Sequence, residues 1–293
     1  MLRINIIANV STSNATNDTC ADESRSVHIP IIFMTIGILS NGVALVILVK
    51  AYKRFRQKWR ASFLLFAIGL VCTDCLGHII TGSITIRVYA MNKNWTRIDS
   101  SGHLCPFFGT SMVFFGLSAL FLGSIMAIER CLGITQPLFH SAKVTARRAM
   151  FILGGTWLFA LVIALLPNFH FGKYTVQYTR TWCFLNTKDV KFGIDSGILL
   201  LFSSLGLTAL STSFLCNTIS GVTLLRSHIK NKLNRQGKSH HIEMLVQLMT
   251  IMLVSCVCWG PFLTQMVSPF LGYRVVNRIG LTAGISDAGD FRR

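Results

Sequence analysis

Six long apolar stretches alternate with short polar segments along this chain. Each apolar stretch has about the 20 residues that an α-helix needs to cross the hydrocarbon core of a bilayer. They cover residues 29–49, 62–86, 106–128, 149–167, 197–225 and 242–268. Helices are expected because lipid cannot satisfy backbone hydrogen bonds. The pattern predicts an all-α membrane protein with six spans in one bundle.

The segment after the sixth stretch is different in character. Arg274, Arg278 and several glycines interrupt it, so we do not expect it to span the membrane. The expected organisation is an amino-terminal segment at 1–28, a six-span bundle at 29–269 and an atypical tail at 270–293.

Charge decides between two classes of partner. The net charge of +17 would suggest nucleic acid in a soluble chain, but hydrophobic residues make up 52% of this one and charged residues only 13%. The basic residues gather in the first, third and fifth loops: Lys50, Lys53, Arg54, Arg56, Lys58, Arg60; Lys143, Arg147, Arg148; Arg226, Lys230, Lys232, Arg235, Lys238. This positive-inside pattern places those loops in the cytosol and the amino terminus outside, and it predicts lipid surroundings rather than nucleic acid.

Glycosylation sequons give a second marker of topology. They begin at Asn9, Asn14, Asn17 and Asn94, all on the predicted exterior side. The first ten residues are too short and polar for a cleavable signal, so the first span is expected to act as the anchor of a multi-pass plasma-membrane protein.

Three of the nine cysteines are exterior, where disulfides form. Cys105 opens the third span and Cys183 lies in the middle of the fourth loop, so a bridge between them would hold that loop across the helix ends. Cys20 is then left without a partner of its own.

Five short motifs lie in order at comparable depths in the spans. They are Gly37-Ile38-Leu39-Ser40-Asn41, Leu70-Val71-Cys72-Thr73-Asp74, Glu129-Arg130-Cys131, Trp157 and Cys258-Trp259-Gly260-Pro261. Together they resemble the rhodopsin-like G-protein-coupled receptors, a seven-helix fold. Three features resemble the prostanoid branch of that family: the sequence Glu129-Arg130-Cys131, a fifth span without proline, and Ser255 in the sixth span. The stretch Arg180-Thr181-Trp182-Cys183-Phe184 also resembles the exterior loop of that branch. The stretches 51–58, 125–131 and 235–241 most resemble prostanoid receptors for prostaglandin F.

The polar residues inside the spans predict an activation switch. Asp74 is a carboxylate in an apolar helix, which is costly unless it is paired or hydrated, so with Asn41 it is expected to form a polar core that admits sodium. Glu129 is expected to hold Arg130 until the helices separate. Alternatives remain for each: a neutral packed acid, and an ordinary interfacial pair.

Further roles follow for the sixth span and the third loop. Pro261 removes a helix hydrogen bond, so we expect a kink that amplifies motion near Trp259, unless that tryptophan only packs. The resemblance implies that Arg130 and a loop containing Pro137 and Leu138 contact a G protein of the Gq class, which activates phospholipase C and calcium release.

The resemblance also implies a lipid pocket, mostly apolar with a few polar groups. Thr181 and Tyr89 would bind the carboxylate of prostaglandin F, and His78 would approach its ring hydroxyls unless it is a core histidine. The apolar lining would comprise Trp182, Met112, Trp259 and Phe262.

Six spans leave the family's seventh helix, with its ligand-binding arginine, outside this sequence. The sequence therefore predicts an alternatively spliced or otherwise truncated form that binds and signals poorly and stays in the endoplasmic reticulum. A second hypothesis is a non-signalling membrane protein that pairs with a full-length receptor. A sibling prostanoid receptor subtype is a third. No catalytic or metal-ligating spacing is found, so no enzyme, metal site or organic cofactor is expected.

Overall fold

A computed structural model describes residues 28–55, 61–92, 94–187, 193–230, 253–254 and 256–267. The predicted tail at 270–293, all of the amino-terminal segment except His28, and much of the stretch 242–268 therefore lie outside the described residues.

Within that part of the chain, five helices are long and apolar enough to cross a membrane, judged by length and composition. They are α1 (His28–Phe55), α2 (Ala61–Ala90), α4 (Leu104–Thr135), α6 (Ala146–Leu165) and α7 (Ile194–Lys230). Four of them contain a predicted stretch completely, whereas the stretch 149–167 runs from α6 into the 3₁₀ helix Leu166–Phe169 that follows it. Because residues 194–230 contain no proline, α7 runs without interruption for 37 residues. The sixth stretch is represented by the shorter apolar helix Cys256–Val267.

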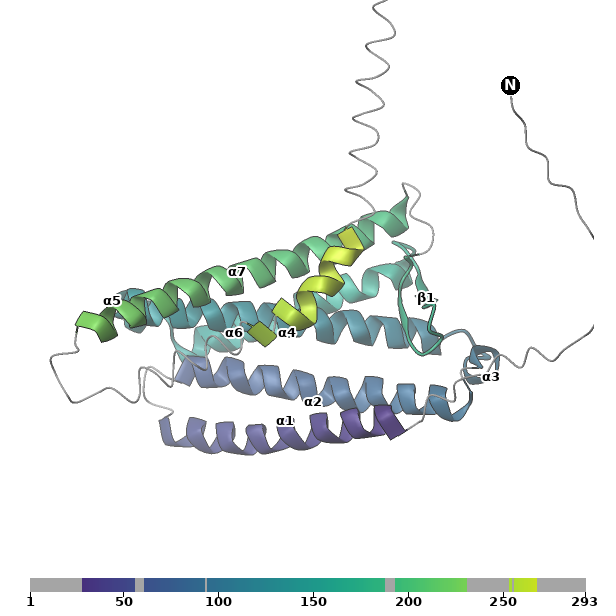
Figure 1. Cartoon of the computed structure of the whole chain (residues 1–293), viewed down its shortest axis with the longest axis horizontal. Helices are drawn as coiled ribbons and strands as arrows, with labels where there is room; N and C mark the ends of the chain where they lie inside the picture. Colours follow the sequence, from purple (N-terminus) through teal and green to yellow (C-terminus); the bar gives the residue numbers. More distant parts are fainter. Residues whose placement is uncertain are drawn as a thin grey trace, which may run out of the picture.

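Helix α4 is the centre of the bundle. It contacts α2, α6, α7 and both strands, whereas α1 packs on α2 at the edge (Figure 1). In the most apolar window of α4, 56% of residues are buried, compared with 0% in α1. The main core forms between α4, α6, α7, the second strand and the helix Cys256–Val267. Residues on α4 can therefore reach most of the other elements.

Three short helices and a hairpin of two strands lie between the spans. They are α3 (Trp95–Ile98), α5 (Pro137–Lys143), the 3₁₀ helix η1 (Leu166–Phe169) and the strands β1 (Tyr174–Val176) and β2 (Cys183–Leu185). The strands pair antiparallel, with Thr175 opposite Phe184. The all-α prediction missed this small sheet in the fourth loop. It can form there because the loop lies beyond the spans, where a sheet edge can meet water.

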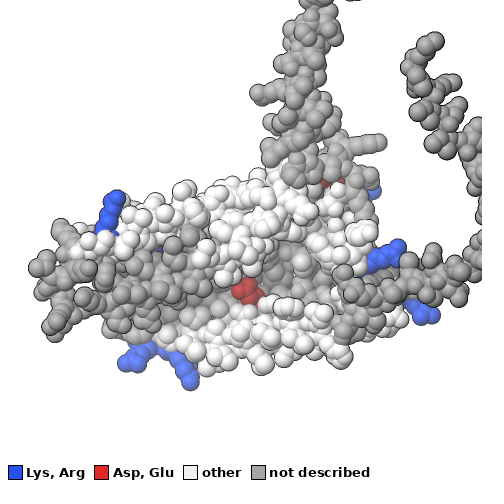
Figure 2. Space-filling view, in the orientation of Figure 1, with Lys and Arg blue, Asp and Glu red and all other residues white. Residues whose placement is uncertain are grey.

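We call the end of the bundle with the strands the hairpin end, and the opposite end the α5 end. On the face in Figure 2, the coloured basic side chains lie near these two ends, and the described surface between them is almost entirely uncharged. An uncharged band between charged ends is the distribution expected for a bundle that crosses a bilayer.

Candidate functional site: an aromatic cavity under a disulfide-pinned hairpin

A cavity of about 360 Å³ lies near the hairpin end, where α4, α7, β2 and the helix Cys256–Val267 meet. Its lining is Met112, Trp182, Phe184, Phe202, Cys258, Trp259 and Phe262. Four of these seven residues were predicted as the apolar lining from the sequence. The volume lies within the range of about 300–1,000 Å³ that is usual for small-molecule sites.

Aromatic rings form most of the cavity wall. The ring of Phe184 lies 5.2 Å from that of Phe202 and 5.5 Å from that of Phe262, in edge-on arrangements. The ring centres of Trp182 and Trp259 lie 6.5 Å and 6.3 Å from the ring centre of Phe262. Such edge-to-face pairs contribute about 0.5–1.5 kcal/mol each beyond area burial. The cavity is therefore a shaped apolar slot rather than a loose gap between helices.

Trp259 can lie deep in the bundle because α4 has a glycine opposite it. A Cβ on Gly116 would be 3.1 Å from the Cη2 atom of Trp259, closer than most real Cβ contacts. The indole of Trp259 thus contacts the backbone of α4. A shift in the position of α4 relative to the helix Cys256–Val267 would therefore displace this ring.

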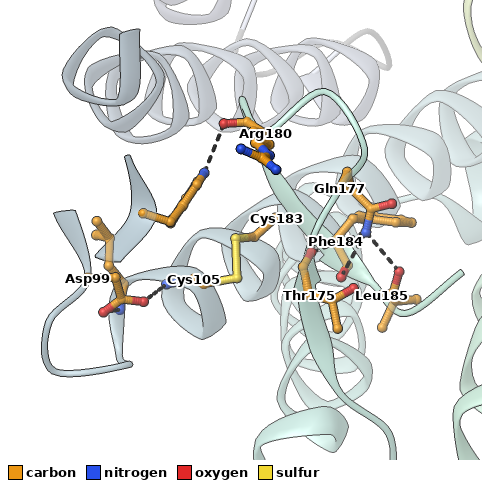
Figure 3. The surroundings of a disulfide bond; sticks show 10 residues. Asp99, Cys105, Thr175, Gln177, Arg180, Cys183, Phe184 and Leu185 are labelled. Carbon is orange, nitrogen blue, oxygen red and sulfur yellow. Dashed lines mark hydrogen bonds between the residues drawn. A yellow bond between two sulfur atoms is a disulfide. The ribbon is translucent and has the colours of Figure 1, made fainter. Parts of the chain in front are cut away.

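The hairpin is held across the cavity by a disulfide (Figure 3). Cys105 at the start of α4 is bonded to Cys183 in β2, with the Cα atoms 5.5 Å apart, which confirms the bridge considered from the sequence. The indole N–H of Trp95 donates to the carbonyl of Arg180, at 2.9 Å. The turn is thereby attached both to α4 and to α3.

Gln177 fixes the hairpin from inside. Its side chain is buried, and the amide nitrogen donates to the carbonyls of Phe184 at 3.4 Å and Leu185 at 3.2 Å on the opposite strand. Its amide oxygen accepts from the Thr187 hydroxyl at 3.2 Å. The Gln177 side chain therefore adds hydrogen bonds to the backbone of the opposite strand beyond those of the short ladder.

Tyr174 anchors the other strand on the bundle. Its hydroxyl donates to the carbonyl of Ala164 on α6, at 2.7 Å, and its ring lies against Gly109, where no Cβ would fit. Burial raises the pKa of the Tyr174 phenol, so it stays protonated and keeps its donor.

At the α5 end, Glu129 has a different partner from the predicted one. Its Oε1 atom lies 3.2 Å from Nε2 of His140 on α5, and both side chains are buried. The guanidinium of Arg130 lies 5.5 Å from the ring centre of Phe63, and its buried Nε atom makes no hydrogen bond within the described residues. The direct side-chain contact of Glu129 is thus with His140, while the charges of Glu129 and Arg130 still interact, so the predicted hold of Glu129 on Arg130 stays a prediction. Consecutive residues on a helix do not face one another.

Known proteins share this sequence and fold. The family model for seven-transmembrane receptors of the rhodopsin family matches residues 40–279. The chain belongs to that family. The human prostaglandin F2-alpha receptor is 56% identical over 253 residues, covering 86% of this chain and 70% of the relative.

More distant relatives belong to the same group. The human thromboxane A2 receptor is 42% identical, with coverage of 79% and 67%. The prostaglandin E2 receptor EP1 subtype of Canis lupus familiaris is 36% identical, with coverage of 83% and 70%. Squid rhodopsin has a similar fold, with a TM-score of 0.66 at 18% identity over 86% of this chain and 73% of that one. These relatives are receptors, which confirms the expectation that this multi-pass membrane protein is not an enzyme.

In this rhodopsin-family chain, the predicted polar ligand contacts Thr181, Tyr89 and His78 are not among the residues that line the cavity. The Thr181 hydroxyl is 2.8 Å from that of Thr179 in the hairpin turn. Tyr89 is half-buried near the end of α2. The ring of His78 lies against Gly37 on α1, where a Cβ would be 2.6 Å from Nε2. Their roles as ligand contacts stay predictions.

The predicted polar core is only partly connected. The amide nitrogen of Asn41 donates to the carbonyl of Gly37 in its own helix, at 3.0 Å. Asp74 is half-buried on α2, and no hydrogen bond to its carboxylate forms among the described residues. Pro261 lies within the helix Cys256–Val267, as expected. The switch roles of these residues remain predictions.

The remaining sequence-based sites divide between the two ends. Pro137 and Leu138 begin the helix α5, not the predicted loop, because proline suits the first turn of a helix. The Leu138 side chain is 86% exposed. Asn94 caps α3 by accepting from the backbone N–H of Arg97, at 3.3 Å. The other sequons, Asn9, Asn14 and Asn17, and also Cys20, lie outside the described residues.

Sequence reasoning missed Phe184, Phe202 and Cys258 in the cavity wall. Phe184 could have been found, because it is two residues from Trp182 in an extended segment and so shares its face. Phe202 had no such signal among the many apolar residues of α7. Groups of three or more His, Cys, Asp or Glu that could hold a metal ion are absent from the described residues.

Proposed function

We propose that this chain is a receptor for prostaglandin F2-alpha, which binds in the aromatic cavity below the hairpin. The strongest support is the 56% identity with the human receptor of that name, over 253 residues and 86% of this chain. An amphiphile with two aliphatic chains suits a slot lined by aromatic and sulfur-containing side chains.

The three predicted polar contacts would orient the ligand. Thr181, in the hairpin, and Tyr89, at the same end of α2, would bind the carboxylate. His78 would meet ring hydroxyls only if its ring turned away from Gly37, so it is the least supported of the three.

Signalling would use the α5 end, which the basic loops place in the cytosol, with the amino terminus outside the plasma membrane. The exposed Leu138 and the guanidinium of Arg130 are the proposed contacts for a G protein of the Gq class. Motion would pass from Trp259 and Pro261 to that end. Asp74 and Asn41 would contribute a polar core, with Asp74 as the candidate sodium ligand.

Saturation binding of tritiated prostaglandin F2-alpha to membranes that contain residues 1–293 tests this function. We expect saturable binding that unlabelled ligand displaces. Cys258→Phe, which fills the cavity, should weaken binding at least tenfold. Cys256→Phe is the matched control, because Cys256 does not line the cavity.

Two outcomes contradict the proposal: no saturable sites on correctly inserted protein, or equal affinity for the two phenylalanine variants. The dissociation constant from the same experiment also tests the sequence-based expectation of weak binding. Calcium release in cells, with and without a Gq inhibitor, tests the coupling separately.

A further inference from the structure

Two cysteine side chains from different spans meet toward the α5 end of the bundle. Cys131 lies about one helical turn before the last residue of α4, and Cys216 lies on α7. Their thiols are joined by a hydrogen bond. The two helices that carry them pack directly against each other. Neither cysteine lines the aromatic cavity, so this contact is separate from the ligand site proposed above.

The contact has the dimensions that a disulfide needs. Packed helices have axes about 8–10 Å apart, and their Cα atoms lie about 2.3 Å from each axis. Residues directly opposite each other therefore have Cα atoms roughly 3.5–5.5 Å apart, which overlaps the ~4.4–6.8 Å that a disulfide spans. Because the two thiols are hydrogen-bonded, both side chains already point across the contact. Rotation of the side chains and a small approach of the sulfur atoms would complete the bond.

The remaining free cysteines of the described residues are arranged differently. They are Cys72, Cys75, Cys256 and Cys258. The first two lie on α2 and the last two on the helix Cys256–Val267, so a bond within either pair would not join two spans. Of the thiols in the described ranges, Cys131 and Cys216 are the ones hydrogen-bonded to each other across two spans.

The pair is accessible to a small oxidant. Both Cys131 and Cys216 are half-buried, so neither thiol is sealed inside the core. The basic loops predict that the α5 end faces the cytosol, where thiols are kept reduced and disulfides are transient. We therefore expect two thiols at rest and a disulfide only after exposure to an oxidant.

Unpaired polar groups flank the two thiols on both helices. Arg130 directly precedes Cys131, and its buried Nε atom makes no hydrogen bond among the described residues. Asn217 directly follows Cys216, and in the same part of the chain its buried Oδ1 atom has no partner either. Unpaired buried groups cost free energy, so this end of the contact between α4 and α7 can gain by rearranging. A covalent link here would oppose that rearrangement.

We propose that Cys131 and Cys216 are a peroxide-sensitive thiol pair whose disulfide fixes α4 to α7. One thiol sulfur attacks hydrogen peroxide, the O–O bond breaks, and a sulfenic acid and one water form. The second sulfur then attacks the sulfenic sulfur, and the hydroxyl group leaves as water with the proton of the second thiol. Two thiols and one peroxide thus give one disulfide and two waters. A dithiol reductant reverses the reaction by thiol–disulfide exchange.

Peroxide treatment of the whole chain tests the pairing. Residues 1–293 in phosphatidylcholine nanodiscs are treated with hydrogen peroxide, free thiols are blocked with N-ethylmaleimide, and unreduced peptides are identified by mass spectrometry. We expect peptides linked through Cys131 and Cys216, at least about tenfold more abundant than any other pair that peroxide creates, because these thiols are held in contact. Dithiothreitol should remove the link. The bridge between Cys105 and Cys183 serves as the internal standard, since it is present before oxidation.

Three serine variants localise the reaction. Cys131→Ser and Cys216→Ser should each abolish the linked product and leave the remaining thiol as a sulfenic acid that dimedone traps. Cys256→Ser is the matched control, because Cys256 is also a half-buried free cysteine, and its replacement should leave the product unchanged. Peroxide should also raise the unfolding temperature of the parent protein by at least about 4 °C, but not that of Cys131→Ser or Cys216→Ser.

Three results would overturn the proposal. They are thiols that stay unreacted in peroxide, thiols that are oxidised without becoming linked, and links from Cys131 to several cysteines in comparable yield. An unchanged unfolding temperature of the linked protein would show that the bond does not fix the two helices. Prostaglandin is absent from this experiment, so its outcome is independent of the function proposed above.

Discussion

Single side chains decide how the ends of the central helix are held. The residue before α4, His103, makes no side-chain capping bond. Asp99 does so instead: its two carboxylate oxygens accept the backbone N–H groups of Leu104 and Cys105, each at 2.9 Å. A carboxylate at a helix amino terminus also interacts favourably with the helix dipole. Asp99 thereby orients the turn of α4 that carries the disulfide to the hairpin.

We predict that Asp99→Ala lowers the free energy of unfolding by about 0.5–2 kcal/mol, as loss of a helix cap does. Asp99→Asn, which keeps one acceptor oxygen, should cost less. Thermal unfolding of the purified protein measures both. Equal stability of Asp99→Ala and the parent protein would show that the cap contributes nothing.

The same carboxylate gives a pH dependence with a defined sign. Partial burial alone would raise the pKa of Asp99, but backbone N–H groups, first those of Leu104 and Cys105, outweigh it and lower the pKa below its ordinary value. The contribution of Asp99 is therefore complete above the ordinary aspartate pKa and is lost as the pH falls through the lowered one. The stability gap between the parent protein and Asp99→Asn should narrow only in strongly acidic solution.

His140 determines the surroundings of Glu129 at the opposite end. Removing one partner of a buried hydrogen bond leaves the other unsatisfied, at a cost of about 1–3 kcal/mol. We predict this loss for His140→Ala and a smaller additional loss when Glu129→Gln is combined with it. Unfolding of the two single variants and the double variant gives the coupling energy. Strictly additive losses would show that the 3.2 Å contact does not stabilise α5.

At the scale of elements, the hairpin depends on the close approach of β1 to α4. Tyr174 contacts Gly109 directly, while its hydroxyl bonds to α6 and β2 is bonded to α4 through the disulfide. The hairpin thus joins two spanning helices on the hairpin side of the cavity. Its position, more than its short ladder, gives the cavity its shape.

We predict that Gly109→Ala displaces the hairpin and costs about 1–3 kcal/mol of stability, as overpacking does. It should also weaken ligand binding in the aromatic cavity. Gly123→Ala, on the same helix with no atom within 4 Å of its new Cβ, should be neutral or slightly stabilising. Comparing the unfolding temperatures of the two variants is the test, and equal values would contradict it.

At the scale of the whole molecule, an almost entirely uncharged band separates two charged ends, one with the hairpin and one with α5 (Figure 2). The sequons and the basic loops predict that these ends lie on opposite sides of the membrane. Asn94 is exposed at the hairpin end, at the start of α3. A glycan there would mark that end as exterior.

We predict that Asn94→Gln removes one glycan, seen as a gel shift that peptide-N-glycosidase abolishes. Thr96→Ala should do the same, and Thr96→Ser, which keeps the sequon, should not. An unshifted Asn94→Gln protein that still carries glycans elsewhere would contradict glycosylation at this site.

The sequence by itself determined the membrane class, the positions of the spans and the family. Hydrophobic run length and motif order are local properties, and lipid permits few alternatives to a helix. The apolar lining residues Met112, Trp182, Trp259 and Phe262 came from resemblance, and the structure brings them together. The bridge between Cys105 and Cys183 was considered because both were predicted to be exterior, one at the start of a span and one in the middle of a loop, and the structure contains it.

Only the tertiary structure decided which side chains meet. Glu129 contacts His140, not Arg130, because adjacent residues on a helix point in different directions and α5 folds back over the end of α4. The hydrogen bonds of Gln177 within the hairpin and the position of Phe202 in the cavity wall have no distinguishing local pattern. Their roles depend on the packing of α4 against several elements distant in sequence, and no periodicity within one helix encodes that arrangement.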